Sequence, residues 1–537
     1  MAARFPCVSP QLAARYRAAG YWRDVLCDAA LQRAASDHGD ATALVDRRGP
    51  IGWGELADRV RATAAGLASL GIAHRDVVSW ILPNWREAAI VHWAVLSLGA
   101  ISNPIVPIYR QREVGRILGQ AGSKLIVAPS SYRGFGYADM LAELRGSLPA
   151  LASVVTVDGA GGDLGFDELC ETSPGAPPNA APDRSPDDPA LLLFTSGTTA
   201  DPKGAVHTHN TLDFEIRSMI DFYGLGAGDV VYMPSPLTHV TGLLYGIQMP
   251  AVLGSSVVYQ DRFEVDEAMD LLVAHGCSFS VGATPFLHGI TEAQKQAPRD
   301  LSLHTFVCGG ADVPPALIRE ASAALRCTAT RAYGSTEFPT VTGGTAADSE
   351  ERRSETDGRV MAHCEVKVVN DAGIEVAPGV AGELIARGPE LFPGYLDGVG
   401  AEAFDAEGWF ATGDLVSVRD GFLTVVGRKK DIIIRGGENI SVKEVEDLLF
   451  AHPDVMEVAV VAMPDPAMGE RACAYVVPAP GATPKLGTLT ALLRGSGLAT
   501  QKFPERLEVV DELPRTASGK VQKNVLRDRI RNLIESE

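Results

Sequence analysis

The residues that follow an apolar run at 191–194 are small or hydroxylic and lead to one lysine. They are Thr195, Ser196, Gly197, Thr198, Thr199, Lys203 and Gly204. Backbone N–H groups and hydroxyls in such a loop can surround phosphate oxygens, and a nearby cation offsets their negative charge. The pattern therefore favours the triphosphate of a nucleotide as a ligand.

This loop differs from a Walker A motif, in which the lysine follows a glycine and precedes Ser or Thr. Here Lys203 precedes Gly204, and Ala205 comes next. Clusters of Thr, Ser and Gly are also typical of ordinary surface turns. The loop alone therefore leaves both a phosphate-binding role and a simple polar turn open.

Further short segments carry residue types that can act on a nucleotide. Within 333–337, an aromatic ring can stack on a purine, and a carboxylate can hold Mg²⁺. Glycines at 309–310 permit the close approach of a flat base, and the carboxylate of Asp414 is suited to ribose hydroxyls. Lys520 follows a run of small residues near the C-terminus. Each residue taken singly could be an ordinary surface or turn residue, but chance explains their joint order and spacing poorly.

The elements that would position these residues follow an alternating pattern. Short apolar runs of strand length alternate with helical patterns along most of the chain, which is typical of α/β layers with largely parallel sheets. The strand-like runs are 77–82, 125–128, 154–157, 191–194 and 305–308. The Pro-rich segment 171–189 is expected to be a surface loop within one large domain.

The pattern changes after residue 414. Two apolar runs, 415–418 and 422–426, flank an Asp-Gly pair, which predicts a β-hairpin. A compact α+β pattern follows, so we place a domain boundary at about Lys430, giving domains 1–429 and 430–537. The second domain is predicted from a capping box at Ser441 and Glu444, strands at 458–462 and 474–477, and a last helix with Val521, Val525, Leu526, Ile530 and Leu533.

Composition excludes several classes of protein. The net charge of −19 disfavours nucleic acids and anionic membranes as partners. Eight scattered cysteines without a C-x-x-C pair predict reduced thiols in a cytoplasmic compartment, not a disulfide framework or zinc site. Two stretches, 88–109 and 234–260, lack charged residues over a membrane-spanning length, but their prolines and polar residues predict buried helix–strand units and no integral membrane segment.

Six segments together resemble the adenylate-forming superfamily, which includes acyl- and aryl-CoA synthetases, firefly-type luciferases and the adenylation domains of peptide synthetases. They are TSGTTADPKG, PLTHVTG, YGSTE, TGD, GRKKDIIIRGGENI and PRTASGK. The resemblance extends from about residue 25 to residue 530. It implies a large N-terminal domain of layered α/β subdomains and a small, mobile α+β lid.

The resemblance also implies a two-step reaction with ATP, Mg²⁺ and coenzyme A. A small carboxylic acid attacks the α-phosphate of ATP and gives acyl-AMP and pyrophosphate, and the thiol of coenzyme A then displaces AMP to give a thioester. Because the carboxylate is already a nucleophile, the site must supply positioning and charge neutralisation. A homodimer is left open.

Specific residues receive roles from the resemblance. Lys520 would lie between the carboxylate and the α-phosphate, Thr336 and Glu337 would act beside it, and Glu337 would hold Mg²⁺. The loop from Thr195 to Lys203 would hold the departing pyrophosphate. The other nucleotide and coenzyme A contacts would be Gly309, Gly310, Ala311, Tyr333, Gly334, Ser335, Asp414, Arg428 and Gly437, with His239, Gly242 and Thr284 at the acid site and a hinge at Lys430.

The identity of the acid is predicted from fewer residues. Val240 stands where several dihydroxybenzoate ligases have asparagine, which disfavours an ortho-hydroxyl aryl acid, and Ala200 replaces a usual glycine of the phosphate loop. Segments 281–286 and 435–440 look most like those of short- and medium-chain fatty acyl and cyclohexanecarboxylate CoA ligases. Apolar pocket walls are expected near Leu243, Leu244 and Phe286.

Three alternatives to an acid–CoA ligase remain. The first is an adenylating enzyme that passes the acyl group to a carrier-protein thiol, although the chain has no carrier domain. The second is a non-catalytic relative, against which the intact Lys520, Glu337 and Asp414 argue. The third is an unrelated kinase, which would release ADP instead of AMP and pyrophosphate.

Overall fold

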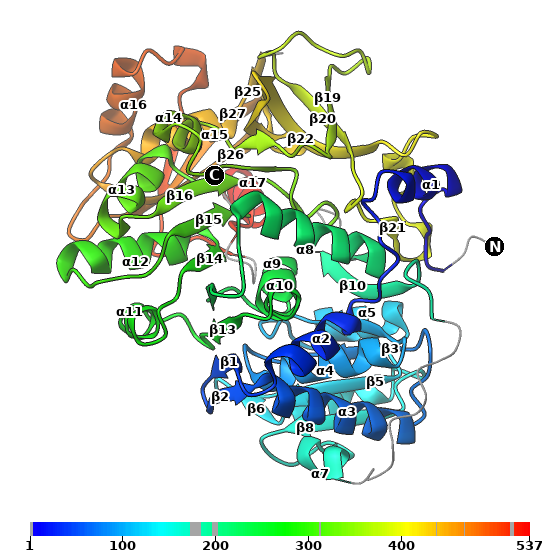
Figure 1. The fold of residues 1–537 in the computed structure, drawn as a ribbon. Helices are drawn as coiled ribbons and strands as arrows, with labels where there is room; N and C mark the ends of the chain where they lie inside the picture. Colours follow the sequence, from blue (N-terminus) through cyan, green and yellow to red (C-terminus); the bar gives the residue numbers. More distant parts are fainter. Residues whose placement is uncertain are drawn as a thin grey trace.

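A computed structural model describes residues 4–171, 184–195, 202–310, 313–435, 438–466, 468–515 and 520–536. The fold is α/β, with a large N-terminal domain and a small C-terminal domain. In Figure 1 most of the blue and cyan segments form the lower part of the molecule, the green segments the middle, and the yellow to red segments the upper part.

The first sheet has eight strands and is mainly parallel. Its order is β21 (Gly394–Tyr395), β11 (Lys203–Thr208), β10 (Pro189–Thr195), β4 (Ile101–Pro104), β3 (Val77–Trp80), β5 (Leu125–Pro129), β8 (Ser153–Val157) and β9 (Leu164–Gly165). All residues of β3 and β5 are buried, as expected for parallel strands that are covered on both faces. The five sequence runs predicted as strands all fall in strands of this sheet or the next.

The second sheet has seven strands, parallel except for its β1–β2 edge. Its order is β16 (Thr328–Ala332), β15 (Thr305–Gly309), β14 (Phe279–Gly282), β12 (Val230–Met233), β13 (Ser256–Tyr259), β1 (Thr42–Asp46) and β2 (Gly49–Gly52). The third sheet is antiparallel and has the order β17 (Thr342–Gly343), β18 (Arg359–Val360), β23 (Phe422–Arg428), β22 (Phe410–Arg419), β20 (Gly382–Arg387) and β19 (Glu365–Val369).

The helices of the large domain alternate with these strands, as the sequence pattern predicts. They are α1 (Pro10–Ala18), α2 (Asp28–His38), α3 (Trp53–Ser69), α4 (Arg86–Ser97), α5 (Gln111–Ala121), α6 (Tyr137–Arg145), α7 (Phe166–Glu171), α8 (His209–Tyr223), α9 (Val240–Gly242), the π-helix η1 (Leu243–Gln248), α10 (Met249–Leu253), α11 (Val265–Ala274), α12 (Thr284–Gln296), α13 (Pro315–Leu325) and α14 (Glu350–Glu355). The short elements are β6 (Ser131–Tyr132), β7 (Phe135–Gly136), η2 (Leu396–Gly398) and η3 (Ala401–Ala403).

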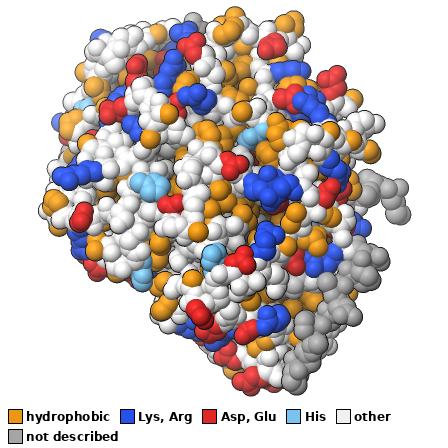
Figure 2. All heavy atoms as spheres, viewed as in Figure 1, with side chains coloured by type: hydrophobic (Ala, Val, Ile, Leu, Met, Phe, Trp, Pro, Cys, Tyr) orange, Lys and Arg blue, Asp and Glu red, His pale blue; other side chains and the backbone are white. Residues whose placement is uncertain are grey.

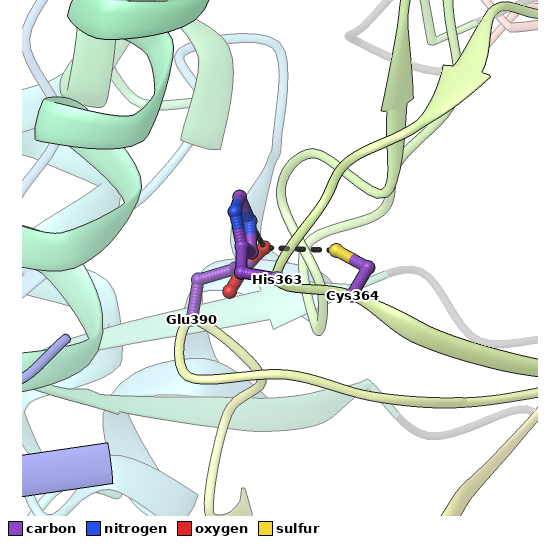
Figure 3. Close-up of side chains that lie close together, drawn as sticks. All are labelled: His363, Cys364 and Glu390. Carbon is purple, nitrogen blue, oxygen red and sulfur yellow. Dashed lines mark hydrogen bonds and ion pairs between the residues drawn. The ribbon is translucent and has the colours of Figure 1, made fainter. Parts of the chain in front are cut away.

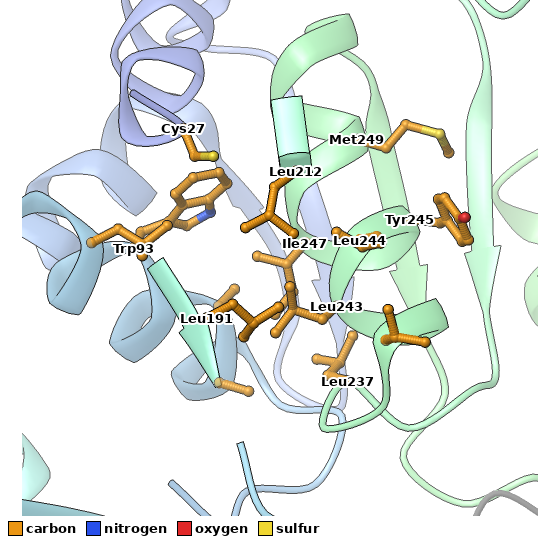
Figure 4. Close-up of a cluster of buried hydrophobic side chains, with 14 of the residues drawn as sticks. Cys27, Trp93, Leu191, Leu212, Leu237, Leu243, Leu244, Tyr245, Ile247 and Met249 are labelled. Atoms are coloured by element: carbon orange, nitrogen blue, oxygen red, sulfur yellow. The ribbon is translucent and has the colours of Figure 1, made fainter. Parts of the chain in front are cut away.

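A shared core joins the first two sheets. Figure 4 shows Leu191 of β10, Trp93 of α4 and Leu243 of η1 in one apolar cluster. Leu191 and Leu243 are completely buried. Because side chains from both sheets pack in this cluster, β10 and η1 have fixed positions relative to each other, which matters for the site described below.

The small domain contains a separate sheet. Its strands are β24 (Ile433–Arg435), β25 (Glu438–Ile440), β26 (Val455–Asp465), β27 (Gly469–Pro478) and β28 (Arg506–Val509), and its helices are α15 (Val442–Phe450), α16 (Leu486–Gly495), the short η5 (Thr500–Lys502) and α17 (Lys523–Ser536). The two predicted strands at 458–462 and 474–477 are parts of the long β26–β27 hairpin. The short 3-10 helix η4 (Lys429–Asp431) connects this domain to β23.

Several local predictions are confirmed, and two need correction. Arg419 pairs with Phe422 around the Asp-Gly turn, so the predicted hairpin forms. The last helix begins at Lys523, so Val521 precedes it, and Leu533 is 40% exposed because it lies on the outer face. Only the Ser441 half of the predicted capping box is confirmed, because the Glu444 carboxylate contacts Lys502.

The two uncharged stretches form helix–strand units of the core. The first contains α4 and β4, and the second contains η1, α10 and β13. Within the described residues, every helix is too short or too polar to cross a membrane. On the face drawn in Figure 2, acidic and basic side chains are interspersed. Of the predicted surface loop 171–189, residues 172–183 lie outside the described part of the chain.

Candidate active site

The predicted phosphate loop connects the antiparallel strands β10 and β11. Thr195 pairs with Lys203 across this hairpin, and the Thr195 hydroxyl donates to the Lys203 carbonyl oxygen at 3.4 Å. The Lys203 ammonium lies 5.3 Å from the ring centroid of Tyr395, a cation–π distance. The hairpin thus holds the Lys203 ammonium beside Tyr395, at the start of β11. Ser196, Gly197, Thr198, Thr199 and Ala200 lie outside the described residues.

The loop after β16 holds Thr336 and Glu337 through backbone hydrogen bonds. The His207 imidazole Nε2–H donates to the Thr336 carbonyl oxygen at 2.7 Å, and the Phe392 N–H donates to the Glu337 carbonyl oxygen at 2.9 Å. Burial lowers the pKa of His207 to about 4 although this bond acts in the opposite direction, so the imidazole is neutral near pH 7 and carries its proton on Nε2. The carbonyl groups of both Thr336 and Glu337 are therefore fixed.

Tyr395 orients the Glu337 side chain. Its hydroxyl donates to Glu337 Oε1 at 2.6 Å. The same aromatic ring lies beside Lys203, so one tyrosine contacts the lysine of the phosphate loop and the proposed metal ligand. The sequence prediction missed Tyr395, although it directly follows a glycine that pairs with β11.

Two further residues of this loop are constrained by packing. An added Cβ at Gly334 would collide with the carbonyl oxygen of Pro339, so the loop closes tightly only with glycine there. The Ser335 N–H donates to the Phe338 carbonyl oxygen at 2.8 Å, and the Ser335 hydroxyl accepts from the Phe338 N–H at 3.1 Å. Ser335 therefore closes the turn that presents Glu337.

Asp414 is held by two side chains. The Tyr333 hydroxyl donates to Asp414 Oδ2 at 2.6 Å, and Arg428 Nε lies 2.7 Å from Asp414 Oδ1. Arg428 faces Asp414 directly across the β22–β23 ladder. Burial and the Asp414 carboxylate raise the pKa of Tyr333 well above its ordinary value, so the hydroxyl stays a donor. The structure therefore brings these three predicted nucleotide residues together.

The glycines after β15 have structural reasons for lacking side chains. An added Cβ at Gly309 would lie 2.7 Å from the carbonyl oxygen of Ala332 on the neighbouring strand β16. Gly310 has φ +77, a conformation that favours glycine. The backbone thus turns sharply at the edge of the sheet, next to the strand that leads to Tyr333. Ala311 lies outside the described residues.

His239 is a predicted residue of the acid site. It precedes α9, and an added Cβ at Gly242 would collide with the carbonyl oxygen of Pro236, so the helix packs closely against the segment that carries His239. The predicted wall residues Leu243 and Leu244 are completely buried in the core, whereas Phe286 is partly buried against Phe263.

Thr284 begins α12 beside the buried thiol of Cys308. This threonine thus lies at the start of a helix that directly follows β14.

Lys520 reaches the same region from the small domain. Burial, and after it the charge of the Lys520 ammonium, lower the pKa of His239 to about 4. The electrostatic effect requires that the two side chains lie near each other. Lys520 directly precedes Val521, which forms an antiparallel bridge with Arg515. The structure therefore brings together the lysine and histidine that the sequence separates by most of the chain's length.

The proposed hinge lies between contacts on both sides. Lys430 is the middle residue of η4, which begins at Lys429, directly after Arg428. Lys429 Nζ lies 2.9 Å from Glu383 of the large domain. Asp431 accepts from Arg527 of α17 at 2.6 Å. Gly437 lies outside the described residues.

Comparisons with known proteins agree with this geometry. The AMP-binding enzyme family model matches residues 31–396, and the model of the AMP-binding enzyme C-terminal domain matches residues 444–520. A medium-chain fatty-acid–CoA ligase of Escherichia coli is 36% identical over 98% of this chain and 94% of its own length. A 2,3-dihydroxybenzoate-AMP ligase of Bacillus subtilis is 32% identical over 97% of this chain and 96% of its own.

Solved structures show the same architecture. The ATP-bound structure of MatB from Rhodopseudomonas palustris superposes with a TM-score of 0.85, at 27% identity, over 95% of this chain and 100% of its own. Both the sequence and the fold matches extend across the large and small domains. The chain therefore belongs to the AMP-binding enzyme family.

Proposed function

We propose that this protein is an ATP-dependent, AMP-forming carboxylic acid–CoA ligase. The proximity of Lys520 to His239 carries the proposal, because it brings a cation of the small domain to the acid side of the large domain. Family membership and the ATP-bound structural relative support ATP as the nucleotide. The medium-chain fatty-acid–CoA ligase among the relatives supports coenzyme A as the acceptor.

Nucleotide binding would use the first domain. Asp414 offers a carboxylate that Tyr333 and Arg428 already orient, and carboxylate oxygens suit the hydroxyls of a ribose. Lys203 stands at the loop that would surround the β- and γ-phosphates. Gly309, Gly310 and Ala311 would border the adenine. These contacts place charge and donors around ATP before the reaction begins.

Acid activation would need the small domain. Lys520 would neutralise charge that builds up between the substrate carboxylate and the α-phosphate. His239 is neutral near pH 7, so it can border the acid without adding a second cation. Because the substrate carboxylate attacks directly, these residues orient it and need not remove a proton.

Mg²⁺ fits the Glu337 carboxylate. Tyr395 holds one of its oxygens, Oε1, which orients the group, and carboxylate oxygen is a preferred Mg²⁺ ligand. When bound, the ion would neutralise phosphate charge. Glu337 is therefore the residue that would hold the metal, and Thr336 would contribute its hydroxyl beside it.

The acid is proposed to be a short- or medium-chain fatty acid or an alicyclic acid. The E. coli relative acts on medium-chain fatty acids by its name, while other relatives are named for aryl acids, so both classes belong in the test. The hinge at Lys430, the boundary between 429 and 430, the role of Gly437 with coenzyme A, a cytoplasmic location and a homodimer stay predictions.

One assay tests the proposal and separates its alternatives. The purified protein is incubated with ATP, Mg²⁺ and a panel of C2–C12, cyclic and aryl acids, with and without coenzyme A. Acid-dependent exchange of labelled pyrophosphate into ATP, with AMP and thioester formed when coenzyme A is added, supports the proposal. Exchange without thioester formation favours a carrier-protein acceptor, release of ADP indicates a kinase, and no exchange with any acid contradicts the proposal.

A further inference from the structure

A buried carboxylate lies between the two segments that carry the proposed acid and metal residues. Glu215 of α8 is 1% exposed. Tyr245 lies in η1, six residues after His239, and Thr340 lies three residues after Glu337. Glu215 contacts both, so α8 bridges the two segments.

The contacts of Glu215 converge on one oxygen. The Tyr245 hydroxyl donates to Glu215 Oε1 at 2.6 Å, and the Thr340 hydroxyl donates to the same oxygen at 2.7 Å. The two hydroxyls lie 2.8 Å from each other. This triangle fixes the relative position of η1 and the loop that ends at Thr340, and η1 is a π-helix, a form often found at functional sites.

A second buried carboxylate, Glu390, extends the cluster. Figure 3 shows His363 and Cys364 directed at its side chain. His363 Nε2 donates to Glu390 Oε1 at 2.7 Å, and the Cys364 thiol lies 3.2 Å from the same oxygen. The imidazole and the thiol both use this one oxygen, and we assign no metal to the three groups.

The electrostatics of the cluster keep Glu215 neutral near pH 7. Burial first, and the charge of Glu390 second, raise the pKa of Glu215 to about 8, while Tyr245, Thr340 and His363 act in the opposite direction. The hydrogen bonds to Glu390 keep the pKa of His363 above its ordinary value. A neutral Glu215 beside the hydrogen-bonded His363–Glu390 pair lets both carboxyl groups remain buried.

We propose that Glu215 is a positioning residue that couples the acid-side helix η1 to the loop carrying Thr336 and Glu337, through simultaneous hydrogen bonds to Tyr245 and Thr340. This inference rests on the proposed function. Glu215 touches no substrate in this arrangement and acts through the two hydroxyls. Replacing Glu215 should therefore change both the KM for the acid and the Mg²⁺ titration.

Two substitutions of similar size distinguish positioning from space filling. Glu215→Gln keeps an acceptor oxygen and resembles the neutral carboxyl, whereas Glu215→Leu fills the space without an acceptor. We expect Glu215→Gln to stay within about threefold of the original protein in acid-dependent pyrophosphate exchange. We expect Glu215→Leu to lose about 10- to 100-fold in kcat/KM for the acid, with a raised acid KM and a shifted Mg²⁺ titration, because two buried donors lose their acceptor.

A matched control comes from Glu87, another buried carboxyl whose pKa is raised by burial, which pairs with Arg48 at 2.6 Å in the large domain. Glu87→Gln and Glu87→Leu are expected to change the melting temperature without changing the acid KM or the Mg²⁺ titration. Equal acid KM and Mg²⁺ titrations in Glu215→Leu and Glu215→Gln would overturn the inference. An equal rise in the acid KM in Glu87→Leu and Glu215→Leu would also overturn the inference.

A double-mutant cycle tests the coupling without relying on activity. Tyr245→Phe and Thr340→Val are combined, and the free energy of unfolding is measured with Glu215 present and with Glu215→Leu. A coupling between the two substitutions that becomes smaller with Glu215→Leu supports the inference, whereas an unchanged coupling, which the direct 2.8 Å contact of the two hydroxyls would explain alone, overturns it. Failure of the original protein to exchange pyrophosphate contradicts the proposed function instead, so the two failures are distinct.

Discussion

The loop at 333–340 and Lys520 both reach the candidate site, but they are held differently. The loop is fixed within the large domain by His207, Phe392 and Tyr395. Lys520 belongs to a domain that is joined to the rest through η4. We therefore expect the proposed metal and nucleotide residues to be preset, whereas the proposed activating lysine would arrive with its domain.

The strongest test of this comparison is Lys520→Ala. We expect the rate of acid-dependent pyrophosphate exchange to fall by about 10²–10³-fold, because a charge that stabilises the transition state is removed. Conversion of supplied acyl-AMP and coenzyme A to thioester should persist, since the preset residues stay in place. Equal loss of both half-reactions would contradict the distinction between preset residues of the large domain and a lysine that arrives with the small domain.

Glu337→Ala tests the proposed metal site of the large domain. Removal of the carboxylate should weaken Mg²⁺-dependent adenylation by about 100-fold at limiting Mg²⁺. The Mg²⁺ titration of pyrophosphate exchange measures this effect. An unchanged titration curve would remove Glu337 from the metal site.

Tyr395→Phe sharpens the comparison within the large domain. The ring near Lys203 remains, but the hydrogen bond to Glu337 is lost. We expect about a tenfold drop in pyrophosphate exchange, the loss typical of one hydrogen bond to a charged group. Tyr395→Leu is the companion variant, because it removes the ring as well, and a phenylalanine variant with full activity would show that Glu337 needs no orientation.

Buried histidines give the large domain a pH dependence of stability. Burial lowers the pKa of His92 from 6.5 to about 3, so the folded state keeps this imidazole neutral. The unfolded chain binds the proton below pH 6.5, so the stabilisation is present above that pH and is lost as the pH falls towards 3. His92→Gln should flatten the decline in unfolding free energy between pH 6.5 and 4, measured by denaturant titration, and an unchanged slope would refute the assignment.

The smallest expected effect concerns the contact at the proposed hinge. Glu383→Gln removes the charge that faces Lys429, a partly exposed pair. Such pairs contribute little, so the ratio of thioester formation to adenylation should change by about twofold to threefold, and less at high salt. A change larger than that caused by Lys520→Ala would mean that the Lys429–Glu383 contact, and not the small domain as a whole, determines the position of Lys520.

Local patterns predicted the elements well. Alternating apolar runs located β10 and β15, and the Asp-Gly pair located the β22–β23 hairpin, because these signals depend on near neighbours in sequence. The error at Val521 arose at a helix end, where periodicity is a weak guide, whereas Leu533 lies in the helix as predicted.

The partners of the predicted site residues were not predictable in the same way. His207 contacts Thr336 across 129 residues, and Glu215 contacts Thr340 across 125 residues. No spacing rule connects residues that only the packed sheets bring together. A single sequence identifies the groups that can do chemistry, whereas the side chains that orient them depend on tertiary packing.

The strand β23 ends at Arg428, and η4 begins at the next residue. A rotation about the proposed hinge would therefore start just beyond the Asp414–Arg428 pair and leave that pair undisturbed. The acyl-AMP, a reactive mixed anhydride, could then stay bound through its adenosine. Meanwhile the small domain would rotate and present a different face to the large domain. Because the acyl-AMP need not dissociate between the two half-reactions, its hydrolysis in solution would be limited.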